Sequence, residues 1–307
     1  MSLHQLASIT IGVPNVAETA HYYSEFGLTP RGDGRFATQD GGEQLRLVHS
    51  PVRRLAGLTI GADDPDDISR IASRLRALNL PATVTEDTIS AQEPAGGFRA
   101  TVAVRPRLRQ PRAEPAPCNG PGRIDRPAAR APGVCRTGPV RPLKLGHVVV
   151  GSTDQKATQR FLTDGIGLKV SDEVSGRAAF LRCSTDHHNV LVQQAPVSFL
   201  HHTAWEVRDI DDIGRGAAAL LAGDPGRHVW GLGRHHVGSN FFWYLKDPAG
   251  NFSEYYSDLD CIVDDAMWEP EVWEGAKGLY SWGPPPPPSF LSPEDLAALM
   301  TGAHAPR

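Results

Sequence analysis

The stretch Gln5-Leu-Ala-Ser-Ile-Thr-Ile-Gly12 is matched in the second half of the chain by Lys144-Leu-Gly-His-Val-Val-Val-Gly151. Both stretches have the apolar pattern of a short strand. Each is followed by an amphipathic stretch that ends in Gly-Leu, Tyr22–Leu28 in the first half and Phe161–Leu168 in the second. This correspondence indicates an internal repeat.

Two further pairs of segments follow in the same order in both halves. Leu55-Ala-Gly-Leu-Thr-Ile60 corresponds to Leu200-His-His-Thr-Ala-Trp205, and each leads into an acidic turn. Later, Pro94-Ala-Gly-Gly-Phe-Arg-Ala100 corresponds to Pro248-Ala-Gly-Asn-Phe-Ser-Glu254. Three matched landmarks in the same order are not the pattern of a chance similarity, so we expect two halves of one architecture.

Each half is predicted to contain two βαβββ-like units, in which strands alternate with helices such as Asp67–Leu78 and Ile210–Leu221. The sequence therefore predicts an α+β protein with two tandem domains. The chain of 307 residues is long enough for both. The expected boundaries are an N-terminal domain at 1–105, a Pro-rich connector at 106–142, a C-terminal domain at 143–262 and a Trp/Pro-rich tail at 263–307.

The connector and the tail have distinct compositions. The connector is rich in proline, and we expect it to run extended over the surface. In the tail, Pro284–Pro288 should also be extended, as a spacer and not as a ligand for a partner domain. Ser292-Pro-Glu-Asp295 is predicted to open a last short helix, with the serine as its cap. Three tryptophans in the tail are expected to be buried, namely Trp268, Trp273 and Trp282.

Composition excludes some classes of function. The net charge is −4, and the one basic stretch, Arg105–Arg141, has no aromatic residue that could stack on a base. We therefore expect no nucleic-acid partner. No apolar run approaches the roughly 18 residues that a membrane span requires, so no membrane association is expected.

Cysteine usage and the N-terminus predict a cytoplasmic protein. The four cysteines form no Cys-x-x-Cys pair and no zinc-ligand pattern, which is typical of free thiols in a reducing compartment. The N-terminus, Met1–Leu6, lacks the basic and apolar regions of a secretory signal. The cysteines are Cys118, Cys135, Cys183 and Cys261.

The candidate chemistry lies in histidines of the second half. Three adjacent pairs, His187-His188, His201-His202 and His235-His236, follow His147 and precede Glu254. Two imidazoles and one carboxylate that converge from separate strands are the ligand set of non-haem Fe(II) oxygenases. If each pair lies on a strand, its two side chains point to opposite faces, so only one of each pair can face a given site.

The alternation favours His202 as the inward member of its pair. His202 shares a face with Ala204 and Glu206, whereas His201 shares the helix-packing face. The turn composition of residues 247–251 predicts a hairpin centred on Ala249, which would place Tyr244 opposite Glu254. An inward carboxylate on a strand rich in aromatic residues is costly unless it is paired or metal-bound.

The first half provides an internal comparison. The repeat places Ser8, Gly57 and Ala100 at the positions of His147, His202 and Glu254. None of the three is a good metal ligand. We therefore expect the first half to share the architecture but not the metal site.

Over residues 5–260 the chain resembles the type I extradiol ring-cleavage dioxygenases of the vicinal oxygen chelate superfamily, the glyoxalase/bleomycin resistance fold. The motifs that carry the likeness are Leu-Gly-His147, Leu-His-His202, Gly-Arg-His235 and the run from Tyr244 to Glu254. The resemblance implies an open, funnel-shaped β-barrel in each domain with helices outside. It also implies Fe(II), or less often Mn(II), held by residues that match His147, His202 and Glu254.

The same resemblance implies roles for further residues. His188 would act as the acid and base, Tyr244 would hydrogen-bond the bound substrate, and His235 would position substrate oxygens. The partners implied are a catechol and O2, and relatives are commonly homo-oligomers. The remaining histidines, His187, His201 and His236, are expected to be outward-facing neighbours.

Two alternatives remain at this stage. One is a metal-dependent isomerase or lyase similar to glyoxalases, whose ligands come from both repeat modules or from two subunits. The other is a non-catalytic protein that binds a small molecule. The complete ligand set and the three additional residues His188, His235 and Tyr244 favour the dioxygenase.

Overall fold

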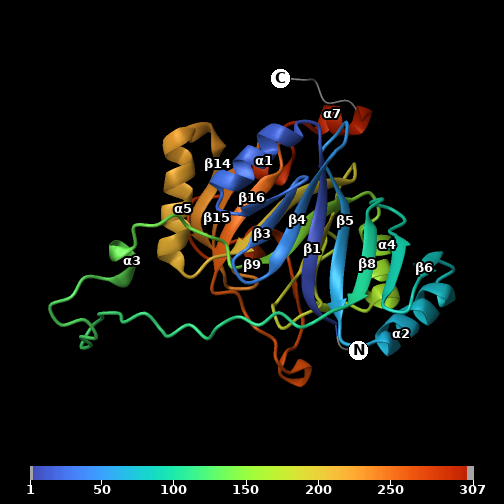
Figure 1. Cartoon of the computed structure of the whole chain (residues 1–307), viewed down its shortest axis with the longest axis horizontal. Coiled ribbons are helices and arrows are strands. Elements are labelled where there is room, and N and C mark those ends of the chain that lie inside the picture. The colour runs from blue at the N-terminus through green and yellow to red at the C-terminus, as the bar shows by residue number, and fades with distance from the viewer. Residues whose placement is uncertain (1–2, 303–307) are drawn as a thin grey trace.

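The computed structural model describes residues 3–302, and two mixed β-sheets form its frame (Figure 1). The first two residues of the chain and the last five of the predicted tail lie outside this range. The first sheet contains β1 (Leu3–Val13), β2 (Thr29–Gly32), β3 (Arg35–Thr38), β4 (Gly42–His49), β5 (Arg54–Ala62), β6 (Ala82–Val84), β7 (Thr88–Gln92) and β8 (Arg99–Val104). The second sheet contains β9 (Lys144–Ser152), β10 (Lys169–Val174), β11 (Ala178–Arg182), β12 (Val190–Gln194), β13 (Phe199–Glu206), β14 (His228–Arg234), β15 (Phe241–Lys246), β16 (Phe252–Ser257) and β17 (Glu271–Trp273).

The strand order of the two sheets is the same. The order β2-β3-β4-β1-β5-β8-β7-β6 of the first sheet reappears as β10-β11-β12-β9-β13-β16-β15-β14 in the second. The predicted repeat and the α+β fold are therefore confirmed. Although the first sheet ends at Val104 and the second begins at Lys144, the division into domains stays a prediction.

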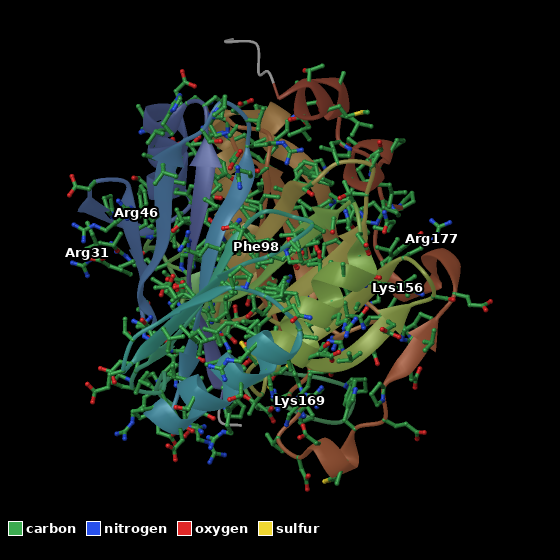
Figure 2. The ribbon with its side chains drawn as sticks, turned by 90° about the vertical axis from the view of Figure 1, so that its right-hand side faces the viewer. Arg31, Arg46, Phe98, Lys156, Lys169 and Arg177 are labelled. Carbon is green, nitrogen blue, oxygen red and sulfur yellow. The ribbon has the colours of Figure 1, made fainter. Side chains whose placement is uncertain are left out.

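Helices cover the outside of the two sheets (Figure 1). In Figure 2 the two halves lie side by side, with Arg31 and Arg46 at the outer edge of the first half, Lys156 and Arg177 at that of the second, and Phe98 between them. The helices are α1 (Val16–Glu25), α2 (Pro65–Ala77), α3 (Pro132–Cys135), α4 (Gln155–Arg160), α5 (Ile210–Gly223), α6 (Pro288–Leu291) and α7 (Leu296–Thr301). The other helical segments are the π-helix η1 (Phe161–Ile166) and the 3-10 helices η2 (Pro225–Arg227), η3 (Asp265–Met267) and η4 (Gly275–Gly278). Within residues 3–302, none of these helices has the length and apolar composition that crossing a membrane requires.

Equivalent elements begin and end by the same chemistry. Asp64 caps α2 through the backbone N–H of Asp67, and Asp209 caps α5 through that of Asp212. The Gly-Leu ends of the amphipathic stretches also have a common cause. Gly27 and Gly167 adopt φ of 98° and 104°, a left-handed conformation that favours glycine at a helix C-terminus.

The two halves also share β-bulges at matching positions. In the first sheet Ala7 and Ala56 have no partner in the ladder between β1 and β5. In the second sheet the same disruption falls at Gly146 and His201, between β9 and β13. A bulge inserts one extra residue and redirects side chains near it.

The first half packs against the outer face of β16. The ring of Phe26, at the end of α1, stacks on Tyr255 with centroids 4.0 Å apart. The Tyr255 hydroxyl donates to the Phe26 carbonyl at 2.6 Å, and the hydroxyls of Tyr22 and Ser253 are also hydrogen-bonded. Because side chains alternate along a strand, Glu254 points to the opposite, inner face of the sheet.

The connector and tail depart in part from expectation. The connector loops away from the body (Figure 1) and returns at α3. The tail adds β17, parallel to β10, and this three-residue strand is too short for a pattern to reveal. The predicted cap at Ser292 is wrong, because α7 begins at Leu296. The Asp295 carboxylate just before α7 binds Arg53, so it does not cap the helix.

Candidate metal centre

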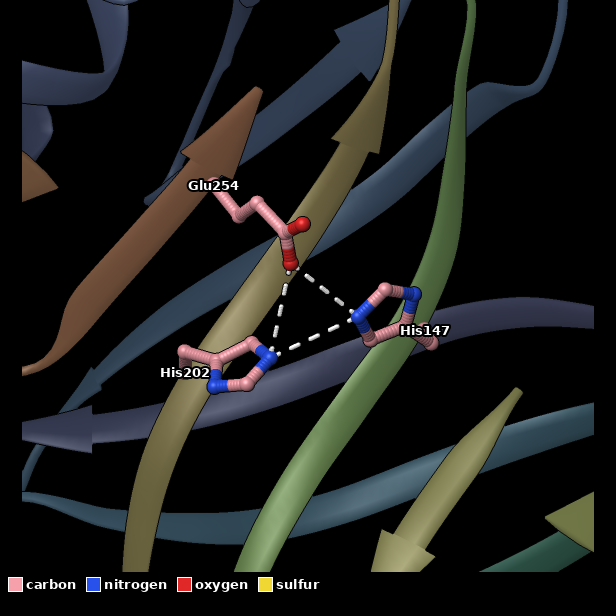
Figure 3. Close-up of side chains that lie close together, drawn as sticks. All are labelled: His147, His202 and Glu254. Atoms are coloured by element: carbon pink, nitrogen blue, oxygen red, sulfur yellow. Dashed lines mark hydrogen bonds and ion pairs between the residues drawn. The ribbon is translucent and has the colours of Figure 1, made fainter. Parts of the chain in front are cut away.

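Three neighbouring strands of the second sheet bring the predicted ligands together (Figure 3). His147 lies on β9, His202 on β13 and Glu254 on β16, and all three are buried. Glu254 Oε2 lies 3.2 Å from His147 Nε2 and 3.5 Å from His202 Nε2. The two Nε2 atoms are 3.4 Å apart.

The arrangement fits a divalent cation. Among the described residues, Glu254 Oε2 has no hydrogen-bond partner although its side chain is completely buried. A carboxylate oxygen in such a place is costly unless a cation or donor meets it. One candidate ligand atom from each residue lies within 4.8 Å of the other two. Two imidazoles and a carboxylate suit Fe(II) and Mn(II).

The second oxygen of Glu254 is held by a residue that the sequence did not reveal. Asn240 donates its Nδ2–H to Glu254 Oε1 at 3.0 Å, and it is itself 1% exposed. This bond fixes the carboxylate and leaves Oε2 to face the two imidazoles. Asn240 lies directly before β15, where neither the strand pattern nor the turn composition singles it out.

His188 stands beside the candidate ligands. Its ring centroid is 4.2 Å from that of His147, and 4% of the residue is exposed. Burial, and then the proximity of His147 and His187, hold the pKa of His188 well below its usual range. The ring is therefore neutral at physiological pH, with one nitrogen available to accept a proton.

His235 and Tyr244 form a hydrogen-bonded pair near Glu254. The Tyr244 hydroxyl and His235 Nε2 are 2.9 Å apart, while His235 Nδ1 donates to the Leu279 carbonyl in the tail. Burial and the nearby Glu254 carboxylate raise the pKa of Tyr244 well above its usual value. Tyr244 pairs with Glu254 across β15 and β16, which confirms the predicted hairpin register.

The expectation that His187 and His201 face outward is wrong. They are 0% and 5% exposed, whereas His236 is exposed, as expected, and packs against Trp273. Strict alternation fails for His201 because it is the unpaired residue of the bulge in β13. It fails for His187 because this pair lies in the loop between β11 and β12, and His235-His236 likewise follows the end of β14.

In the described part of the first half, the positions equivalent to the three candidate ligands carry no histidine or carboxylate, but one of the predicted equivalents is wrong. Ser8 and Gly57 occupy the ladder positions of His147 and His202. Thr59 pairs with Thr101 as Ala204 pairs with Glu254, so the equivalent of Glu254 is Thr101 and not Ala100. The loop between β7 and β8 is one residue longer than that between β15 and β16, which shifts the correspondence.

The sequence is similar to a known protein family and to individual dioxygenases. Residues 144–255 match the model of the Glyoxalase/Bleomycin resistance protein/Dioxygenase superfamily. Metapyrocatechase 2 of Cupriavidus necator is 28% identical over 301 residues, which cover 94% of this chain and 92% of that protein. An iron-dependent extradiol dioxygenase of Rhodococcus jostii is 31% identical over 154 residues, which cover 45% of this chain and 50% of that protein.

A solved structure extends the likeness to the whole fold. The Mn(II)-bound glyoxalase from Novosphingobium aromaticivorans has a TM-score of 0.73 at 23% identity, and the match covers 100% of this chain and 95% of that one. At this identity the likeness shows the fold alone. The second half of the chain therefore resembles the glyoxalase/vicinal oxygen chelate superfamily, and the relatives that the chain is similar to include extradiol dioxygenases.

Proposed function

We propose that this protein is an extradiol dioxygenase, which uses O2 to open the ring of a catechol next to its two hydroxyl groups. Both oxygen atoms enter the product, a ring-opened semialdehyde. The observation that carries the proposal is the buried convergence of His147, His202 and Glu254 beside His188, His235 and Tyr244. The full-length similarity to a metapyrocatechase supports it.

His147, His202 and Glu254 are the proposed ligands of Fe(II), or alternatively of Mn(II). When bound, the metal would supply coordination positions for the catechol oxygens and O2, and a path by which electrons of the catechol reach dioxygen. The iron-dependent relative favours Fe(II). Asn240 positions the carboxylate ligand, since it donates to the oxygen that the metal would not use.

The other residues act on protons and hydrogen bonds. His188, neutral because of its burial, takes a proton from a catechol hydroxyl and returns it later in the reaction. The raised pKa of Tyr244 keeps its hydroxyl protonated; its one hydrogen meets His235 Nε2 in this structure and would turn to an oxygen of the substrate when one is bound. His235 orients that hydroxyl through its bond to Tyr244.

A glyoxalase-like isomerase is the competing function, because the solved glyoxalase has the same fold. All three candidate ligands here come from one half of the chain, whereas the expectation for that class was ligands shared between modules or subunits. The two functions differ in oxygen consumption. An isomerase needs no O2.

The test is reconstitution with Fe(II) without oxygen, followed by a panel of catechols in air. We expect oxygen uptake matched by a yellow ring-opened product. Metal-loaded protein that consumes no oxygen with any catechol would exclude the dioxygenase. Conversion of a hemithioacetal by the same sample, without oxygen uptake, would establish the isomerase.

The setting of the enzyme is also a proposal. The four free cysteines support a cytoplasmic location. We propose that the protein works as a homo-oligomer without nucleic-acid or membrane partners, and that its domains divide at the boundaries expected from the sequence. Light scattering of the purified protein will give the oligomeric state.

A further inference from the structure

Two buried histidine pairs have the same internal hydrogen-bond arrangement. His201 Nδ1 lies 2.7 Å from His202 Nδ1, and His187 Nδ1 lies 3.0 Å from His188 Nδ1. In each pair, the second histidine faces the metal centre and the first lies behind it. The first histidine in turn meets a further acceptor at its Nε2 atom.

The acceptor behind His201 comes from the tail. His201 Nε2 is 2.7 Å from the Phe290 carbonyl oxygen in α6. A carbonyl oxygen can only accept, so His201 Nε2 carries a hydrogen. In a neutral ring, Nδ1 is then an acceptor, and the hydrogen between the two rings belongs to His202 Nδ1. His202 Nε2 is left with a bare lone pair, on the side of Glu254.

The acceptor behind His187 comes from β10. His187 Nε2 is 3.3 Å from Asp172 Oδ2, while Asp172 Oδ1 accepts from the backbone N–H of Glu271 at 2.8 Å. A carboxylate only accepts, so the same reasoning places hydrogens on His187 Nε2 and on His188 Nδ1. His188 Nε2, on the opposite side of its ring, is then free to accept a proton.

From this repeated geometry, we infer that His187 and His201 are positioning residues that fix the tautomers of His188 and His202. The inference deepens the proposed function and rests on it. His202 and His188 then have the same tautomer, with a hydrogen on Nδ1. His202 needs the unprotonated Nε2 to bind a metal, and His188 needs it to accept a proton. Asp172 and the Phe290 carbonyl are the acceptors that determine which nitrogen of His187 and of His201 carries the hydrogen.

The His202 arrangement is tested by metal affinity. In His201→Asn the amide oxygen can replace Nδ1 as the acceptor, whereas His201→Leu offers no acceptor. We expect the Leu variant to bind Mn(II) about 10–100-fold more weakly than the original protein, and the Asn variant to stay within a few-fold. The control is His236→Leu, which changes an exposed histidine outside the arrangement.

The affinity results have clear consequences. A Leu variant that binds Mn(II) as tightly as the original protein would overturn the inference for His201. So would an Asn variant as weak as the Leu variant, provided that both unfold at the same temperature as the original. Calorimetric titration of the refolded, metal-stripped protein gives the affinities without any turnover.

The His188 arrangement is tested by nitrogen NMR of protein labelled at histidine. The shifts of His188 should show a protonated Nδ1 and a bare Nε2. Asp172→Asn should reverse them: the new amide oxygen takes over the Glu271 N–H, so its NH2 group donates to His187 Nε2. Asp186→Asn is the control. Asp186 lies in the same loop as His187 and His188, but its carboxylate binds Lys144.

A hydrogen on His188 Nε2 in the original protein would refute the inference outright. An unchanged pattern in Asp172→Asn would refute the role of Asp172. Because affinity and NMR are measured without catalysis, they separate this inference from the proposed function. Protein with the expected tautomers that consumes no oxygen would refute only the function.

Discussion

Glu254 shows how one side chain can serve both structure and chemistry. Its Oε1 accepts from Asn240, and its Oε2 faces two imidazoles with no hydrogen-bond partner among the described residues. The sequence predicted this orientation, because the turn at residues 247–251 fixes the hairpin register and thereby the face of Glu254. It could not reveal Asn240, whose position depends on where the preceding loop enters β15.

Replacement of the carboxylate should remove the metal. Residues that hydrogen-bond a metal ligand contribute roughly 10–100-fold to affinity, so Asn240→Ala should weaken Fe(II) binding by that factor. Glu254→Gln removes a ligand itself and should weaken Fe(II) binding by more than ~100-fold. Elemental analysis after reconstitution measures both. Glu206→Gln, on β13 and hydrogen-bonded to Gln110, should retain full metal content. Full occupancy in Glu254→Gln would show that Glu254 is not a ligand.

His188 should matter for turnover and not for metal content. Because the proposed role is proton transfer, His188→Phe should lower turnover per bound iron by about 10²–10⁴-fold while iron content stays near that of the original protein. Oxygen uptake normalised to iron is the measurement, with His236→Phe as the control. Loss of iron with unchanged turnover per remaining iron would instead make His188 a structural support of the centre.

At the scale of elements, regular strands were predictable and irregular ones were not. The strands at β1, β9, β5 and β13 follow from apolar patterns, and the repeat fixed their order. The alternation rule then failed where the backbone is irregular, at the bulge that contains His201 and in the loop that contains His187. Both residues were therefore assigned to the wrong face, although the pairs themselves were recognised.

The connector is anchored where it meets α5. Arg136, which follows α3, binds the carboxylates of Asp209 and Asp212 at the N-terminus of that helix. The hydrogen bond from Arg136 holds the pKa of Asp209 below its usual value. A carboxyl group of this kind stabilises the fold above its ordinary pKa of about 4, and this stabilisation is lost as the pH falls through the lower, folded-state pKa.

Removal of this anchor should therefore have a pH-dependent effect. We expect Arg136→Gln to lower the free energy of unfolding at pH 6, and the difference from the original protein to shrink as the pH falls below about 4. Urea unfolding between pH 3 and pH 6 measures it. Arg130→Gln, in an exposed part of the connector, should show no such trend. A difference that grows toward low pH would contradict the assigned ion pair.

At the scale of the whole molecule, Arg53 joins three parts of the chain. From the turn before β5, its guanidinium binds Asp295 in the tail at 2.8 Å and donates to the Leu200 carbonyl next to the bulge of β13. It is 3% exposed. The tail also supplies the carbonyls of Leu279 and Phe290 to His235 and His201. No pattern in the sequence reveals these contacts, because they join residues far apart in the chain.

Loss of this junction should destabilise the whole fold. Hydrogen bonds to charged groups contribute about 1.5–3 kcal/mol, so we expect Arg53→Met to lower the free energy of unfolding by about 2–3 kcal/mol. Arg35→Met is the matched control, because Arg35 forms exposed pairs with Asp33 and Glu43 and should change stability by less than ~1 kcal/mol. If urea unfolding shows the same loss of stability for Arg53→Met and Arg35→Met, the contacts of Arg53 stabilise the fold no more than an exposed ion pair does.

The paired bulges at Ala56 and His201 have a consequence for how such a centre can arise. The backbone irregularity that lets two imidazoles meet at the second sheet is present in the first sheet as well, where no ligand uses it. The path of the main chain at the bulges therefore does not depend on the presence of ligand side chains. A metal centre of this kind is then determined by the side chains that the strands carry, and the same bulged strands can exist with or without it.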